Sequence, residues 1–82
     1  MIMRNYLCVK NVKTIDGTFV AYVERIEDVK RITFSSVYVF FHKKDGSAIA
    51  YYVDNILILK EEHAQKDIVR DGKWLLENTE IE

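Results

Sequence analysis

The sequence of 82 residues contains no proline, three glycines and a single cysteine. Because Cys8 is alone, the chain can form no internal disulfide, and a zinc site built on several cysteines is excluded. Isolated glycines cannot build the glycine-rich loop that binds phosphates. No apolar run approaches the roughly 20 residues of a membrane-spanning helix, and residues 1–10 lack the apolar segment and cleavage site of a signal peptide. We therefore expect a cytoplasmic protein with no membrane partner.

The sequence also has no large excess of either charge. It contains 12 Lys and Arg and 13 Asp and Glu, which gives a net charge of −1. A protein built mainly to bind a polyanion needs clustered Lys and Arg, so this balance argues against one. Residues 1–60 carry nine basic and six acidic side chains, and residues 61–82 carry three and seven. We therefore expect one small domain over residues 1–82, in which an acidic C-terminal extension (61–82) packs on a mildly basic barrel core (1–60) or extends it.

What the chain does have is a concentration of β-branched and aromatic residues between positions 37 and 59. Two apolar runs flank Asp45-Gly46, and a third run, 56–59, follows Asp54-Asn55. Asp-Gly between apolar runs favours a β-hairpin, because Gly accepts the positive φ of a tight turn. The segment therefore predicts a three-stranded meander that forms the core of the domain.

A two-residue loop at Asp45-Gly46 would place Phe41 opposite Ala50. One face of the sheet would then carry Val37, Val39, Phe41, Ala50 and Tyr52. The other face would carry Tyr38, Phe40, His42, Ile49, Tyr51 and Val53. Both faces are apolar, whereas an antiparallel sheet with one solvated face alternates apolar and polar residues. Either other elements cover both sides of a curled sheet, or one face binds a partner.

The same turn signal predicts a hairpin over residues 6–24, in which a two-residue loop at Asp16-Gly17 places Val12 opposite Ala21. The polar side chain of Lys10 indicates that this strand leaves the core near that position. The charged residues 24–31 favour one turn of helix or an irregular connection over a strand.

The third glycine also follows an aspartate, which favours a hairpin around Asp71-Gly72 with Ile68-Val69 opposite Trp74-Leu75. The rival interpretation is a helix over residues 60–78, which Gly72 would destabilise by about 1 kcal/mol relative to Ala. One short helix near 61–66 followed by the hairpin combines the two interpretations.

Few side chains fit a catalytic or metal site. His42 and His63 are the only histidines, and their spacing matches no zinc-binding pattern, so we expect no metal. Cys8 lies in an apolar run typical of an inert buried thiol. The serines lie next to turns, where hydroxyls commonly bond the local backbone. We therefore expect no enzymatic activity, no cofactor and no small-molecule substrate.

Residues 51–59 read YYVDNILIL, an apolar run, a turn at Asn55 and a final apolar run. This segment resembles the closing motif of Sm-like RNA-binding barrels, and it equally resembles the end of SH3 domains, where a short turn with Asn leads into the last strand. The resemblance implies a small barrel. No counterpart of the first Sm motif, with its nucleotide pocket, is present, nor are the acidic loop and proline-binding aromatics of SH3 domains, so no binding residues carry over.

Together these patterns predict an all-β, mainly antiparallel fold, a small SH3-like or Sm-like barrel or a strongly curled sheet of roughly five to seven strands. We expect a non-catalytic protein-interaction or assembly module that binds another protein or itself, because large apolar patches usually mark partner sites. The alternative is a single-stranded nucleic-acid or RNA-binding barrel, which would stack bases on aromatics beside lysines. An enzyme ranks third. The candidate binding surface consists of Tyr38, Phe40, His42, Lys43, Lys44, Tyr51 and Trp74.

Overall fold

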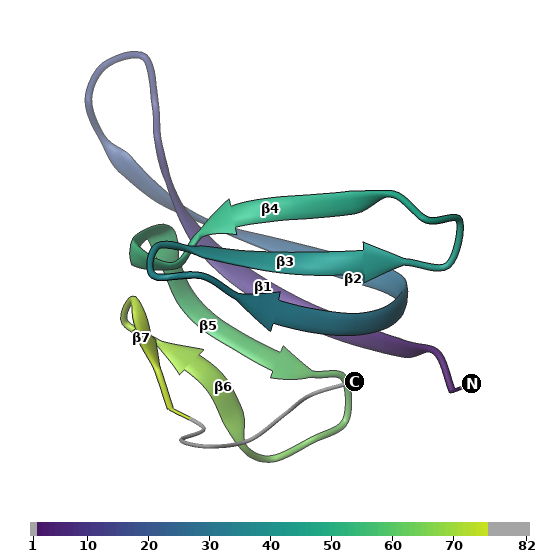
Figure 1. Ribbon diagram of the computed structural model, residues 1–82. Helices are drawn as coiled ribbons and strands as arrows, with labels where there is room; N and C mark the ends of the chain where they lie inside the picture. The colour runs from purple at the N-terminus through teal and green to yellow at the C-terminus, as the bar shows by residue number, and fades with distance from the viewer. Residues whose placement is uncertain (1, 76–82) are drawn as a thin grey trace.

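Seven antiparallel strands form one strongly curled sheet in the computed structural model, which describes residues 2–75 (Figure 1). The elements are β1 (Arg4–Lys13), β2 (Phe19–Phe34), β3 (Tyr38–Lys43), β4 (Ala48–Tyr52), the 3-10 helix η1 (Val53–Asn55), β5 (Ile56–Glu61), β6 (Asp67–Arg70) and β7 (Lys73–Trp74). Their order across the sheet is β4-β3-β2-β1-β5-β6-β7, so β4 and β7 are its edges. The expected all-β fold is confirmed, in the form of a half-barrel.

The concave face of the sheet holds the core. Side chains alternate between the two faces along each strand, so one set of residues from each long strand gathers inside the curl. The buried residues are Tyr6, Cys8, Ile26, Val29, Ile32, Val39, Phe41, Val53, Ile56, Leu59, Ile68 and Val69. The ring of Phe41 lies 5.9 Å from the ring of Tyr6 and 5.6 Å from that of Tyr51, measured between centroids. Burial of these apolar side chains is the main source of stability.

β2 is the longest strand, and it runs through the charged segment 24–31. The expected helical turn there is wrong, because Ile26 and Val29 face the core while the charged side chains lie at exposed or half-buried positions. β2 pairs with β1 up to Val29 and with β3 from Val29 onward. The β1–β2 register and the β2–β3 register both shift by a residue next to Val29. At the bend, the Asp28 N–H donates to Asn5 Oδ1 (3.1 Å), and the Asp28 carbonyl accepts from the Lys44 N–H (3.1 Å). The N–H and carbonyl of Asp28 therefore both have hydrogen-bond partners at the bend that curls the sheet.

The three strands of residues 37–59 do not form a meander. β3 pairs with β4, as predicted, but β5 pairs with β1 and β6 instead of β4. After Tyr52, the Val53 N–H donates to the Val37 carbonyl at 2.8 Å, and the Val53 side chain is buried, so η1 turns the chain away from β4. β5 then lies beside β1 with Leu59 opposite Cys8. β4 is left as an edge strand.

The first two Asp-Gly pairs close three-residue loops instead of the two-residue loops that we assumed. The Lys43 N–H donates to the Ser47 carbonyl (2.8 Å), and the Gly46 N–H donates to the Lys43 carbonyl (3.1 Å). The Asp45 carboxylate accepts from both the hydroxyl (2.6 Å) and the N–H (2.9 Å) of Ser47, and these bonds lower the pKa of Asp45. Gly46 takes the positive φ of 91° that ends this kind of loop. The loop at Asp16-Gly17 follows the same pattern, with Thr18 in the place of the serine.

The extra loop residue shifts each register by one position, which moves the residues of one strand to the opposite face. Tyr52 lies opposite Tyr38, and Tyr51 lies opposite Val39. Tyr51 therefore faces the core, and Tyr52 shares the outer face with Tyr38 and Phe40, the reverse of the predicted arrangement. In the first hairpin, Val12 likewise lies opposite Val20 instead of Ala21.

The hairpin around Asp71-Gly72 is confirmed. Here the loop does have two residues, with φ of 50° and 76°, and Val69 lies opposite Trp74. These positive φ values are those of a type I′ turn, which Asp followed by Gly accepts readily. β6 and β7 therefore extend the sheet beyond β5.

The alternative of a short helix near 61–66 is wrong. β5 continues to Glu61 because this residue pairs with Tyr6 of β1, and a turn follows in which His63 takes a φ of 70°. The last acidic residues of the predicted extension lie after position 75, outside the described residues. Within residues 2–75, the structure has no helix of the length and apolar character that a membrane span requires.

Candidate functional site

The β1–β2 hairpin projects beyond the rest of the sheet as an arm, defined here as residues 11–23 (Figure 1). The arm begins after Lys10, the last β1 residue that pairs with β5, and every residue in it is exposed. Of the ten large hydrophobic side chains exposed in residues 2–75, six belong to the arm. They are Val12, Ile15, Phe19, Val20, Tyr22 and Val23. The arm is therefore the main apolar surface of the described chain.

Both faces of the arm are apolar. Val12 lies opposite Val20 on the face that continues into the core, and Phe19 and Val23 lie on the outer face, where they are 66% and 65% exposed. A two-stranded ribbon is at best marginally stable in water unless another layer covers it. The sequence carries this signal as FVAYV (residues 19–23), a strand without a single polar residue, but our candidate binding residues did not include it.

A polar cluster at the base of the arm holds it against β4. Lys10 Nζ lies 3.0 Å from Glu24 Oε2 and 3.9 Å from the centroid of the Tyr51 ring, and the Tyr51 hydroxyl donates to Glu24 (2.6 Å). Burial and the neighbouring Glu24 carboxylate raise the pKa of Tyr51. Burial also raises the pKa of Glu24, but the hydrogen bonds from Tyr51 and Lys10 outweigh it, so that this pKa lies below its usual value. Tyr51 thus connects the arm to the sheet and does not lie on the predicted outer surface.

Four aromatic rings follow one another along the outer face of the β3–β4 hairpin. We call them the aromatic stripe: Tyr38, Phe40 and His42 of β3 and Tyr52 of β4. The Tyr38 and Tyr52 rings stack at 4.7 Å, Phe40 lies 5.9 Å from Tyr38, and His42 lies 6.5 Å from Phe40. Sequence reasoning missed Tyr52 because the assumed two-residue loop placed it on the other face.

Polar groups border the stripe on β2. The hydroxyl of Thr33 lies 2.8 Å from His42 Nε2, and the exposed Arg31 pairs with His42 across the strands. The stripe therefore combines three half-buried rings and the exposed ring of Tyr52 with a cationic side chain at one end.

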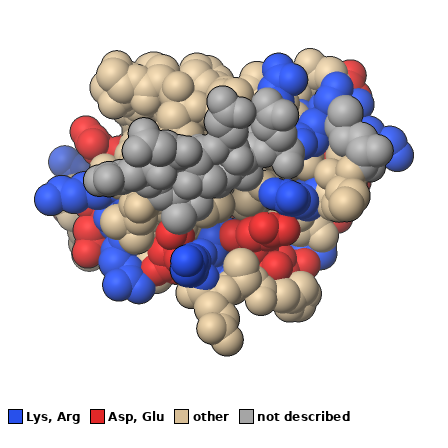
Figure 2. Space-filling model, turned by 60° about the horizontal axis from the view of Figure 1, so that its bottom comes forward, with Lys and Arg blue, Asp and Glu red and all other residues tan. Residues whose placement is uncertain are grey.

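The lysines at the tip of the β3–β4 hairpin lie in a mixed-charge setting. The Lys43 ammonium donates to the Glu27 carbonyl, and Lys44 is exposed. These lysines and the carboxylates of Asp28 and Asp45 line a shallow cleft. Figure 2 likewise shows Lys and Arg interspersed with Asp and Glu on the face that it presents.

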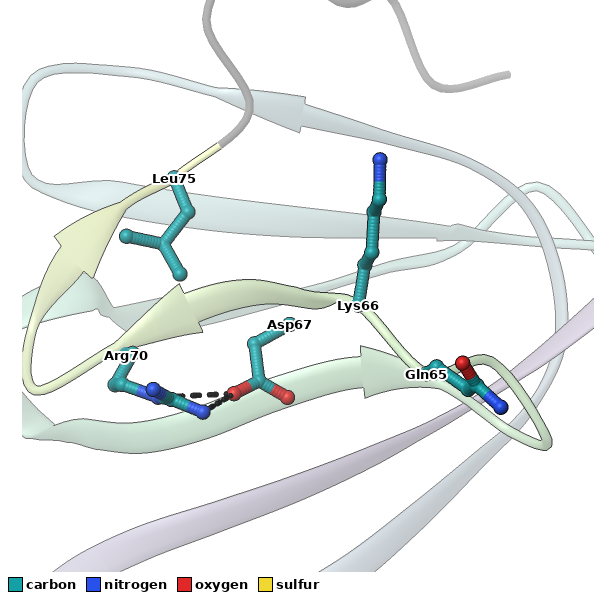
Figure 3. A pocket seen from close by; sticks show the side chains of 5 residues that line it. All are labelled: Gln65, Lys66, Asp67, Arg70 and Leu75. Carbon is teal, nitrogen blue, oxygen red and sulfur yellow. Dashed lines mark hydrogen bonds and ion pairs between the residues drawn. The ribbon is translucent and has the colours of Figure 1, made fainter.

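Trp74 is separated from the other predicted site residues. It is half-buried against Phe34 and the core, on the edge strand opposite β4. A nearby hollow is lined by Gln65, Lys66, Asp67, Arg70 and Leu75 (Figure 3). Its main charges already pair, because Arg70 donates to Asp67 Oδ2 at 3.0 and 2.6 Å. The structure thus brings together Tyr38, Phe40 and His42 on the outer face, with Lys44 exposed in the loop beyond them. Lys43 pairs with the buried Val29 and therefore points to the other face, and Tyr51 and Trp74 are also separate from the stripe.

The groups capable of covalent or metal chemistry lie apart. Within residues 2–75, the structure contains no group of three or more His, Cys, Asp or Glu side chains that could hold a metal ion. Cys8 is fully buried, as expected from its apolar run, and burial raises the pKa of its thiol to about 12. A thiol with this pKa stays protonated and unreactive at neutral pH. On residues 2–75, the exposed groups suited to contact a partner are therefore the apolar side chains of the arm and the rings of the aromatic stripe.

Comparison with known protein families, with curated proteins and with solved structures found no match to this chain.

Proposed function

We propose that the protein is a non-catalytic interaction and assembly module that associates with itself. The observation that carries this proposal is the arm, which exposes large apolar side chains on both faces. Burial of apolar surface contributes about 25 cal/mol per Å², and contiguous exposed apolar patches of several hundred Å² mark interaction sites. Lys13 and Asp16 are the only charged residues between positions 11 and 23. Two arms can therefore pack along their length with few charged side chains between them.

The double substitution Phe19→Ser and Val23→Ser tests this proposal. Both side chains are more than half exposed, so we expect the monomer to keep its stability to within about 0.5 kcal/mol. Self-association should weaken at least about tenfold, because the outer face of the arm loses its apolar area. Sedimentation velocity over a range of protein concentrations measures both the mass and the affinity.

The matched control is Val37→Ser with Leu75→Ser, which removes two exposed large hydrophobics outside the arm. It should associate as the unmodified protein does. A chain that sediments as a 9.7 kDa monomer at every concentration would contradict the proposal.

The aromatic stripe favours a second candidate function, the binding of single-stranded nucleic acid. Bases stack on exposed rings with about 1–3 kcal/mol per base, and neighbouring cations contact the phosphates. Tyr52 is half exposed beside Tyr38, while Arg31 and Lys44 are exposed at the other end of the stripe. This function would use the outer face of β3 and β4 and leave the arm free.

For this second candidate, we expect Phe40→Ala to weaken binding to a mixed-sequence oligonucleotide about fivefold or more, through the loss of one stacking ring. Replacing Arg31 and Lys44 by Glu should weaken it further and reduce its salt dependence. Fluorescence anisotropy at low salt measures the affinity, and the arm variant Phe19→Ser with Val23→Ser serves as the control that keeps it. Failure of the unmodified protein to bind at low salt rules this candidate out.

A further inference from the structure

β4 is an edge strand that lacks the usual protection against pairing with another strand. Natural edge strands carry Lys, Pro or bulges that discourage such pairing. The β4 sequence, AIAYY, contains no charged residue, no proline and no glycine, and its pairing with β3 runs without a bulge. β4 ends the strand order of the sheet, and among the described residues β3 is the one strand that pairs with it.

The register of the β3–β4 hairpin decides which backbone groups of β4 are free. Residues of an antiparallel pair alternate between those that bond the partner strand and those that point away from it. Ser47 and Val53 bond β3 through Lys43 and Val37, so the odd-numbered residues of β4 face β3. The N–H and C=O groups of Ala48, Ala50 and Tyr52 therefore point out of the sheet edge, where within the described residues they have no strand partner.

We propose that the β4 strands of two copies pair antiparallel across a two-fold axis at Ala50 and join the two sheets into one. This inference rests on the proposed function, since it supplies an interface for the self-association. With Ala50 opposite its own copy, Ala48 lies opposite Tyr52 of the second copy. Every outward-pointing N–H and C=O of β4 then meets a partner, because the free residues are placed symmetrically about Ala50.

The side chains on the outer face fit this register. Within one copy, Phe40 lies beside Ala50, and His42 lies beside Ala48. Across the seam, the half-exposed ring of Tyr52 covers the small Ala48 of the second copy and reaches toward its His42. Large side chains thus meet small ones, and the two aromatic stripes become one continuous surface.

Charge also fits a second copy as the occupant of this edge. The paired strands carry no charges that would repel each other across the axis. The same register places Asp54 of one copy opposite Gly46 of the other, beside both Asp45 and Lys44, so the exposed charges at each end of the seam are mixed in sign. Stable interfaces bury roughly 1,200–2,000 Å² of surface. A five-residue edge strand and its neighbours can bury less than this. The pairing is therefore concentration-dependent.

The test compares the unmodified protein with Ala50→Lys, which places two ammonium groups against each other at the axis. Ala50 is exposed in the single copy, so the variant should fold, which its circular dichroism checks. Thr33→Lys is the matched control, because it adds the same charge on the same face in the row of Phe40, two strands from the edge. Sedimentation should show association weakened at least about tenfold in Ala50→Lys and unchanged in Thr33→Lys.

Amide hydrogen exchange of the unmodified protein supplies a direct second readout. The Ala50 and Tyr52 amides should become protected as protein concentration rises, while the Ile49 and Tyr51 amides, which face β3, are protected at all concentrations. If Ala50→Lys associates normally and these two amides exchange freely in the oligomer, the edge pairing is overturned. In that outcome, loss of association in the arm variant still upholds the proposed function. A protein that is monomeric at all concentrations overturns both.

Discussion

Replacement of Phe41 by Ala should destabilise the protein by about 3–5 kcal/mol, while replacement of its neighbour Phe40 by Ala should cost about 1 kcal/mol or less. Phe41 is fully buried and contacts the rings of Tyr6 and Tyr51, so its removal leaves a cavity in the centre of the core. Phe40 lies on the outer face, where water fills the space that its ring vacates. Equilibrium urea unfolding of the two variants measures the difference.

This pair of substitutions tests the assignment of the two sheet faces. Stabilities of folded domains are about 5–15 kcal/mol, and small domains lie near the lower end. Phe41→Ala should therefore leave much of the protein unfolded at 37 °C, whereas Phe40→Ala should melt cooperatively a few degrees below the unmodified protein. Equal losses in the two variants would mean that the outer face of β3 is also packed, which contradicts the described sheet.

The second large effect is expected at Gly72, where substitution by Ala should cost about 2–4 kcal/mol. Gly72 has a φ of +76°, and a Cβ built there would lie 3.2 Å from the Asp54 Cα and 3.3 Å from the Asp54 carbonyl oxygen. These are backbone atoms of η1 and cannot rotate away. The Gly72 N–H also donates to the Ile56 carbonyl at 2.8 Å, which ties this turn to the start of β5.

Gly46→Ala provides the matched control for this prediction. Gly46 has a φ of +91°, but a Cβ there would meet no atom within 4 Å. Its substitution should cost only the left-handed backbone conformation, about 1–2 kcal/mol. Thermal and urea unfolding of both variants separate the steric cost from the conformational one. If the two variants lost the same stability, the contact between the tail hairpin and η1 would carry no energy.

Short-range features of the fold were predictable from the sequence. Asp-Gly pairs between apolar runs predicted all three hairpins, because a glycine that accepts positive φ is a local requirement of such turns. The lone Cys8 in an apolar run predicted a buried thiol, and Lys10 indicated the point where the first hairpin leaves the core. Each of these conclusions depends on a few neighbouring residues, and the structure agrees with each of them.

The candidate site was only partly predictable, because it depends on register. Ser47 and Thr18 close their loops through the carboxylates of Asp45 and Asp16, and the resulting extra loop residue reverses the faces of β4. Since both faces of this hairpin are apolar, hydrophobicity could not reveal the error. The prediction therefore placed Tyr51 in the stripe and left out Tyr52.

The sequence alone therefore determined the all-β class and the places of the turns, since these follow from local conformational preferences. Only the tertiary structure decided which strands pair, which face of each is buried and which remain uncovered. β5 lies beside β1 instead of β4, and there Leu59 and Ile56 are fully buried in the core. Within residues 2–75, this arrangement leaves β4 as an edge strand and the residues of the arm exposed. The two surfaces on which the proposals rest are consequences of long-range packing.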